Sequence, residues 1–165
     1  NRTYHHTAPT NSLFALHEAL LVLKEEGLEN AWARHRRNHL ALKAGLEAMG
    51  FTYLVKEQYR LPQMNAVFVP QGVDEAEVRK ILLNEFNLEI GAGLGPLAGK
   101  IWRFGLMGYS CKPENVMLCL SALGSVLSNM GVAVKVGEAE AAAHQAYAAQ
   151  HAAEAALKLK RVANG

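Results

Sequence analysis

The chain has 165 residues, of which 50% are hydrophobic, and its 17 basic and 15 acidic side chains leave a formal net charge of +2. That length and that apolar fraction are sufficient for one domain with a core. The small net charge argues against a nucleic-acid-binding protein, and no apolar stretch approaches the ~20 residues of a membrane span. We therefore expect small-molecule or protein partners, and neither nucleic acid nor a membrane.

The start of the chain and its two cysteines bear on processing and compartment. Asn1 stands where an initiating methionine would be, and the polar residues after it contain no signal-peptide core, so we expect a truncated chain. Cys111 and Cys119 lie on what is predicted as one helix, roughly 12 Å apart at about 1.5 Å per residue, too far for a disulfide. Reduced thiols favour a cytoplasmic protein.

Two helices are predicted at the start of the chain. Apolar residues recur at helical spacing over residues 13–23, and Gly27 can end that helix in a left-handed conformation. A second helix is predicted from about Leu28 to Met49, followed by Gly50. Its polar run, residues 34–39, is expected to form a solvated basic face.

The period of the pattern changes after Gly50. Short runs rich in β-branched and aromatic residues predict four strands, at residues 51–55, 64–69, 87–90 and 100–106. Asp74 can cap a helix over residues 75–86, and Pro113 opens another that ends near Asn129. Strands interleaved with helices predict an α+β fold, a short and mostly antiparallel sheet packed with helices.

Residues 138–160 are dominated by alanine, which favours a helix, but they include few large apolar side chains. Helices in proteins are stabilised mainly by a packed apolar face. We expect a solvated or loosely docked extension, with a partner-binding helix as the alternative.

Two familiar motifs fail on their context. The glycine-rich segment 91–100 is interrupted by Pro96 and precedes a strand, whereas a nucleotide-binding loop must open a helix. His35 and His39 lie one helical turn apart, but Arg36 stands where the zinc-protease pattern needs a glutamate, and nothing completes a ligand set. We therefore expect no nucleotide and no metal.

Arg103 lies in the middle of an apolar strand, where burying a guanidinium is costly unless an anion meets it. Glu89 could be that anion within the protein. A substrate carboxylate could be bound instead, because the planar guanidinium receives a carboxylate through two parallel hydrogen bonds. The residues alone leave both interpretations open.

The stretch Tyr4-His5-His6-Thr7 is polar and near the start, as exposed residues usually are. Its tyrosine and threonine hydroxyls could nevertheless donate two hydrogen bonds to a phosphate.

The order and spacing of several short motifs is similar to the C-terminal portion of fold-type I (class V) aminotransferases that use pyridoxal 5'-phosphate (PLP), in the alanine:glyoxylate or serine:pyruvate family. The motifs lie between Tyr4 and Asn129, among them Glu89–Gly95, and the most specific are Glu26–Asn30 and the segment from Gly93-Leu94-Gly95 to Arg103–Leu106. The resemblance implies a homodimer in which Arg103 binds the substrate α-carboxylate. It also implies that Tyr4 and Thr7 reach the cofactor phosphate of the neighbouring subunit.

The resemblance divides the chain into three parts. Residues 1–38 would be the end of the large cofactor domain with linking helices, residues 39–131 the small C-terminal domain, and residues 132–165 a tail outside the family match. The Schiff-base lysine of the family is expected upstream of Asn1, so this chain would hold no catalytic residue and would be inactive alone.

The function that the resemblance implies is transfer of an amino group from alanine or serine to glyoxylate or another small 2-oxo acid. The alternative is a stand-alone, non-catalytic α+β binding module derived from that family. Members of the family work in more than one compartment, so in a eukaryote the peroxisome and the mitochondrion stand beside the cytoplasm.

Overall fold

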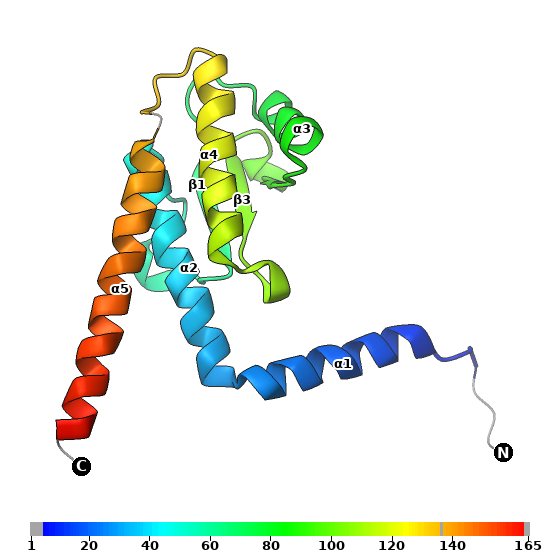
Figure 1. Ribbon diagram of the computed structural model, residues 1–165. Helices are drawn as coiled ribbons and strands as arrows, with labels where there is room; N and C mark the ends of the chain where they lie inside the picture. The colour runs from blue at the N-terminus through cyan, green and yellow to red at the C-terminus, as the bar shows by residue number, and fades with distance from the viewer. Residues whose placement is uncertain (1–4, 136, 164–165) are drawn as a thin grey trace. The chain divides into compact units, whose positions relative to one another are not determined.

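The structure is a computed structural model that describes residues 5–135 and 137–163 (Figure 1). The chain forms two compact units, Asn1–Ala33 and Arg34–Gly165. The three-part division expected from the sequence, with boundaries after residues 38 and 131, stays a prediction.

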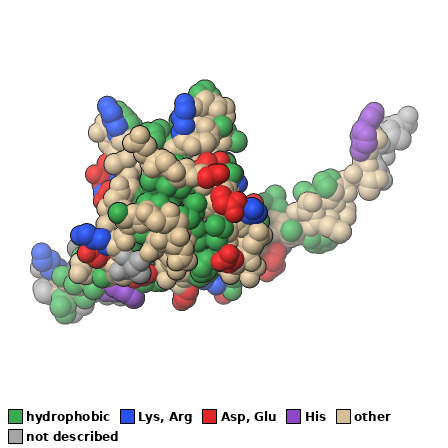
Figure 2. All heavy atoms as spheres, turned by 90° about the horizontal axis from the view of Figure 1, so that it is seen from above, with side chains coloured by type: hydrophobic (Ala, Val, Ile, Leu, Met, Phe, Trp, Pro, Cys, Tyr) green, Lys and Arg blue, Asp and Glu red, His purple; other side chains and the backbone are tan. Residues whose placement is uncertain are grey.

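The first unit contains helix α1, Thr10–Glu26, and the first turns of helix α2, Leu28–Ala48. Gly27 separates the two helices with φ of +83°, a conformation that glycine adopts without steric cost. No residue of α1 is buried, and apolar side chains are visible along it in Figure 2. Its large exposed apolar residues are Leu13, Phe14, Leu16, Leu20, Leu21 and Val22.

The second unit is built on a three-stranded antiparallel sheet. Strand β3, Ile101–Gly105, lies between β1, Met64–Phe68, and the short β2, Gly91–Ala92. Helices α3, Glu75–Phe86, and α4, Pro113–Asn129, complete this part of the unit together with α2. Short 3₁₀ turns occur at Glu57–Tyr59, Gly95–Leu97 and Gly108–Ser110. The predicted α+β class is confirmed.

The core lies where α2, α3 and α4 meet one face of the sheet. Trp102 is fully buried there, and its indole nitrogen donates a hydrogen bond of 3.3 Å to the carbonyl of Glu75 at the start of α3. Leucines of the helices fill the rest, among them Leu42, Leu46, Leu82, Leu120, Leu123 and Leu127. Both predicted helix starts are confirmed, because Asp74 accepts from the amides of the first turn of α3 and α4 begins at Pro113.

Two of the four predicted strands are wrong. Residues 51–55 make only an isolated bridge, between Tyr53 and Val67, because the amide of Phe51 is still tied to the end of α2. Residues 87–90 form no strand, because the amide of Leu88 bonds back to the last turns of α3. On this side of the sheet, pairing with β3 therefore begins only at β2.

Helix α5, Glu138–Ala163, is docked over its first half, so of the two states expected, solvated or loosely docked, the solvated one is wrong there. Ala139 and Ala143 are buried, and the hydroxyl of Tyr147 donates a 2.7 Å hydrogen bond to Asn38 of α2. Gly45 of α2 allows the approach, since a Cβ there would lie 3.0 Å from the carbonyl oxygen of Ala139. Small side chains on both helices let them pack closely, although α5 has few large apolar residues.

The polar run of α2 is not the solvated face expected from its composition. His35, Asn38 and His39 are buried, whereas Arg36 is exposed. Asn38 donates to the carbonyl of Cys111, a residue that precedes α4 rather than lying on it. Polar residues at helical spacing can line a buried face when the elements packed against it supply hydrogen-bond partners.

No helix in the described part of the chain is both long enough and apolar enough to cross a membrane. Within the same residues, no three His, Cys, Asp or Glu side chains gather as a metal site would require.

Candidate substrate-carboxylate site

Arg103 lies on the face of β3 opposite the core. Its neighbours Trp102 and Phe104 point into the core, so the alternation of a strand directs Arg103 to the other side. The register places Ala66 of β1 and Gly91 of β2 directly opposite Arg103. Arg103 is therefore flanked by two small residues in the neighbouring strands.

One backbone carbonyl holds the guanidinium. The Nε atom of Arg103 donates a hydrogen bond of 2.7 Å to the carbonyl oxygen of Ala92. The side chain also lies against Gly91, where a Cβ would come within 3.4 Å of both Nε and a terminal nitrogen. Neither terminal nitrogen has a hydrogen-bond partner among the residues that the structure describes, and neither is fully buried.

The carboxylate that could have been the internal partner, Glu89, does not pair with Arg103. No described acidic side chain lies within ion-pair distance of Arg103. Glu89 instead contributes to raising the pKa of Arg79, after the hydrogen bond and charge of Glu75. Arg103 therefore keeps a positive charge that the described part of the chain does not neutralise.

The loop between β2 and β3 fixes the position of β2. The amide of Gly93 donates to the carbonyl of Ile101 at 3.1 Å. A Cβ at Gly93 would lie 1.9 Å from the carbonyl oxygen of Leu97, so only glycine fits there. The segment that looked like a nucleotide loop is thus a tight connection that aligns Ala92 with Arg103.

The predicted phosphate-binding residues belong to the first unit. Thr7 is exposed in the segment before α1, with its hydroxyl available to a ligand. Tyr4 lies outside the described residues. Arg103 belongs to the second unit.

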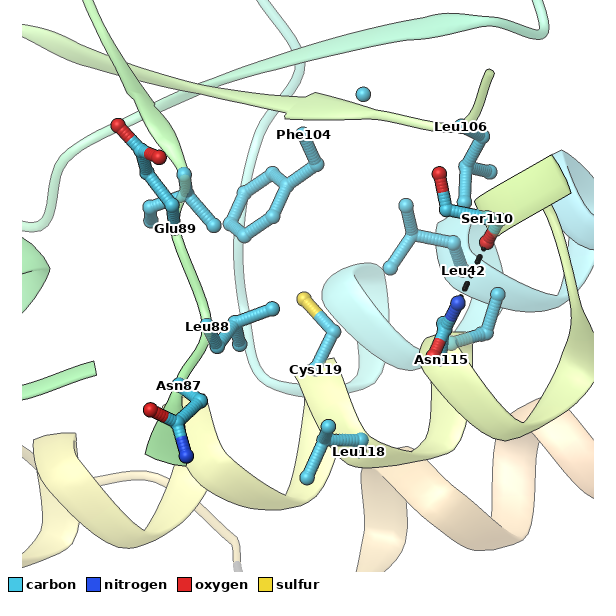
Figure 3. Close-up of a pocket in the computed structure, with 13 residues that line it drawn as sticks. Leu42, Asn87, Leu88, Glu89, Phe104, Leu106, Ser110, Asn115, Leu118 and Cys119 are labelled. Carbon is cyan, nitrogen blue, oxygen red and sulfur yellow. Dashed lines mark hydrogen bonds between the residues drawn. The ribbon is translucent and has the colours of Figure 1, made fainter. Parts of the chain in front are cut away.

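A hollow that no sequence motif predicted lies between α4, the end of β3 and residues 87–90 (Figure 3). Its volume is about 290 Å³. Asn115 donates to the carbonyl of Ser110 at its wall. Burial raises the pKa of the Cys119 thiol to about 12, so this thiol is protonated near neutrality and is a poor nucleophile.

A buried polar cluster under β1 was also missed. His39 Nδ1 donates to Asn65 Oδ1 at 2.6 Å, and the hydroxyl of Tyr53 donates to the same oxygen at 3.3 Å. The guanidinium carbon of Arg60 lies 4.1 Å from the centre of the Tyr53 ring. Burial lowers the pKa of His39, and the charge of Arg60 adds to that effect. An asparagine inside an apolar strand was the one available signal.

Comparison with known proteins places this chain in a family. No family model matches the chain. The (S)-ureidoglycine–glyoxylate transaminase of Bacillus subtilis is 43% identical over 146 residues, which is 88% of this chain and 35% of that protein. The alanine–glyoxylate aminotransferase of Callithrix jacchus is 43% identical over 129 residues, 78% of this chain and 31% of that protein. The chain belongs to the alanine–glyoxylate aminotransferase family.

Solved structures of aminotransferases agree with the sequence relatives. The ureidoglycine–glyoxylate aminotransferase of Bacillus subtilis matches with a TM-score of 0.83 and 43% identity, over 87% of this chain and 37% of that one. The pyridoxamine–pyruvate aminotransferase of Mesorhizobium loti matches with a TM-score of 0.85 and 29% identity, over 91% and 38%. The chain thus spans about a third of the length of these aminotransferases and corresponds to a C-terminal portion of them.

Proposed function

We propose that this chain is the carboxylate-binding portion of a PLP-dependent aminotransferase that moves an amino group from alanine or serine to glyoxylate or another small 2-oxo acid. The observation that carries the proposal is the guanidinium of Arg103. It is held at Nε by Ala92, while its terminal nitrogens have no partner among the described residues. The family of relatives, all named for glyoxylate or pyruvate transamination in the cases above, supplies the reaction.

Arg103 would fix the α-carboxylate of the substrate. Two parallel hydrogen bonds from a planar guanidinium set both the position and the orientation of a carboxylate. The α-carbon is then held in one place for proton transfer. Amino donor and 2-oxo acceptor carry the same carboxylate beside the reacting carbon, so one arginine serves both halves of the reaction.

PLP, when bound, supplies the electron sink that allows the α-proton to be removed. Among the described residues, Thr7 fits the cofactor in chemical type, because its exposed hydroxyl can donate to a phosphate oxygen. Tyr4 is proposed as the second donor. In a homodimer the two residues would hold the cofactor phosphate of the partner subunit.

The lysine that binds the cofactor covalently is proposed to come from another part of the polypeptide. Among the lysines that form ion pairs in the described residues, Lys43 has the least exposed side chain, and it pairs with Glu57 and Glu47. Lys100, three positions before Arg103, is exposed at the end of the loop before β3. On this proposal the chain by itself binds carboxylates but does not catalyse transamination.

The proposal is tested in the complete aminotransferase with Arg103→Ala. Loss of a bidentate, charge-assisted contact of ~3 kcal/mol should raise the KM for alanine by about 100-fold. Cofactor content, read from the visible absorbance of PLP, should stay near that of the parent protein. Arg36→Ala removes an exposed guanidinium and is the matched control. Equal loss of cofactor and of substrate binding would contradict the role given to Arg103.

A further inference from the structure

Strand β2 is too short to add much to the sheet, yet both of its residues contact Arg103. Gly91 lies opposite Arg103 in the register, and the carbonyl of Ala92 accepts from Arg103 Nε. Resting on the proposed function, we propose that β2 is a positioning element for Arg103. The carbonyl of Ala92 accepts the hydrogen bond of Nε. Gly91 is a positioning residue, because the guanidinium lies in the space that a side chain at this position would take.

The hydrogen bond to Ala92 decides how a carboxylate can approach. A guanidinium can receive a carboxylate side-on, through Nε and one terminal nitrogen, or end-on, through both terminal nitrogens. The 2.7 Å bond from Nε to Ala92 removes the first mode. The carboxylate is therefore received end-on, through the two terminal nitrogens.

Gly91 leaves space for that placement. A Cβ at this position would lie 3.3 Å from the Cβ of Arg103 and 3.4 Å from Nε and one terminal nitrogen. The contact with the Cβ of Arg103 is tighter than an ordinary van der Waals separation, and the contacts with the two nitrogens are at its lower limit. The two residues face each other across a hydrogen-bonded pair of strands. A side chain at Gly91 would push the guanidinium off Ala92 and free Nε.

Gly105 offers a matched control on the same strand and the same face as Arg103. A Cβ there would meet only the terminal methyl of Met107, at 3.7 Å, an ordinary contact. Gly105→Ala should therefore leave Arg103 in place. Gly91→Ala is the matched test, and Gly91→Val is the stronger one, because valine suits a strand but adds two methyl groups beside the guanidinium.

The readout is the Nε–H resonance of Arg103 in NMR spectra of the 165-residue chain, assigned by its disappearance in Arg103→Lys. We expect the Nε–H proton of Arg103 to exchange with water about tenfold or more slowly than that of the exposed Arg36, because a hydrogen bond protects it. Arg60 is the internal reference, because its Nε donates 2.8 Å to the carbonyl of Val55, remote from Gly91. The indole resonance of Trp102 reports whether each variant keeps its fold.

Supporting results are a slowly exchanging Arg103 Nε–H that becomes fast in Gly91→Val, with Arg60 and Trp102 unchanged and Gly105→Ala like the parent. If Gly91→Val loses the Trp102 resonance, Gly91→Ala decides in the same way. A fast Arg103 Nε–H in the parent chain, or one that Gly91 variants leave unchanged, would overturn the proposal.

Titration with pyruvate tests carboxylate binding separately from the positioning of Arg103 by β2. End-on binding should shift the terminal guanidinium resonances of Arg103 while its Nε–H stays protected. Exposure of Nε–H on adding pyruvate would mean a side-on approach and would overturn the inference. A protected Nε–H with no response to pyruvate would leave the positioning by β2 supported and count against the proposed function.

Discussion

Tyr147 of α5 and Asn38 of α2 are joined by a 2.7 Å hydrogen bond across 109 positions of sequence. Asn38 is fully buried and also donates to the carbonyl of Cys111 at 3.0 Å, so this one side chain joins α2, α5 and the segment before α4. The alanine-rich helix is therefore part of the second unit.

Removing the hydroxyl tests the docking of α5. Tyr147→Phe leaves the buried oxygen of Asn38 without its donor, which should lower the free energy of unfolding by ~1–2 kcal/mol. Urea unfolding followed by circular dichroism measures it. Tyr59→Phe, at a side chain that is 70% exposed, is the control and should change little. Equal stability of both variants would mean that the contact contributes nothing.

His39 should make the second unit less stable in mild acid. Its pKa in the folded chain is lowered from 6.5 by burial, and the charges of Arg60, Lys43 and Arg36 act in the same direction. The unfolded chain therefore binds the proton more tightly, so the free energy of unfolding falls as the pH drops through 6.5 towards the folded pKa.

The measurement compares parent and His39→Gln by urea unfolding at about pH 8 and about pH 5.5. The parent should lose more stability between the two conditions than the variant does. His144→Gln, at an exposed position of α5, is the control and should keep the parent's pH dependence. Identical pH dependence in the parent and in His39→Gln would rule out His39 as the source.

Cys119 should resist alkylation in the folded chain. Its pKa of about 12 leaves about one thiol in 10⁴ ionised near pH 8, and only the thiolate reacts. Peptide-level mass spectrometry after iodoacetamide should find Cys119 unmodified under native conditions and fully modified in denaturant. Rapid native modification would mean that the hollow beside α4 admits solvent and reagent.

Helix α1 should cause the isolated chain to self-associate. Its large apolar side chains are exposed, among them Phe14 at 74% and Leu20 at 56%, and such a contiguous surface is rarely left uncovered. Sedimentation velocity should show oligomers, reduced in the double variant Phe14→Ser, Leu20→Ser. Leu94→Ser, at an exposed side chain of the second unit, is the control. A monodisperse monomer would favour the stand-alone binding module over a portion of an aminotransferase.

The helices of the second unit were predictable because their signals are local. Asp74 caps α3, and Pro113 starts α4, as their side chains and backbone restrictions dictate. Strand β2 was not predictable, since its two residues are aligned by the contact of Gly93 with Leu97, a property of the folded loop.

For the candidate site, the sequence singled out Arg103 because a charge in an apolar strand needs an explanation. Its bond to Ala92 depends on the register of β2 against β3, which no local pattern encodes. The burial of His39 was missed for a similar reason, because its partner Asn65 is 26 positions away. Long-range polar pairs of this kind become visible only in the structure.

The most direct test of the central claim compares two amines in the complete aminotransferase, alanine and ethylamine, which lacks the carboxylate. If Arg103 binds the carboxylate, Arg103→Ala should lower kcat/KM for alanine by about 100-fold or more, the loss of ~3 kcal/mol, and leave the slow reaction of ethylamine unchanged. An equal loss with both amines would show that Arg103 acts on the fold or the cofactor, and would contradict the account.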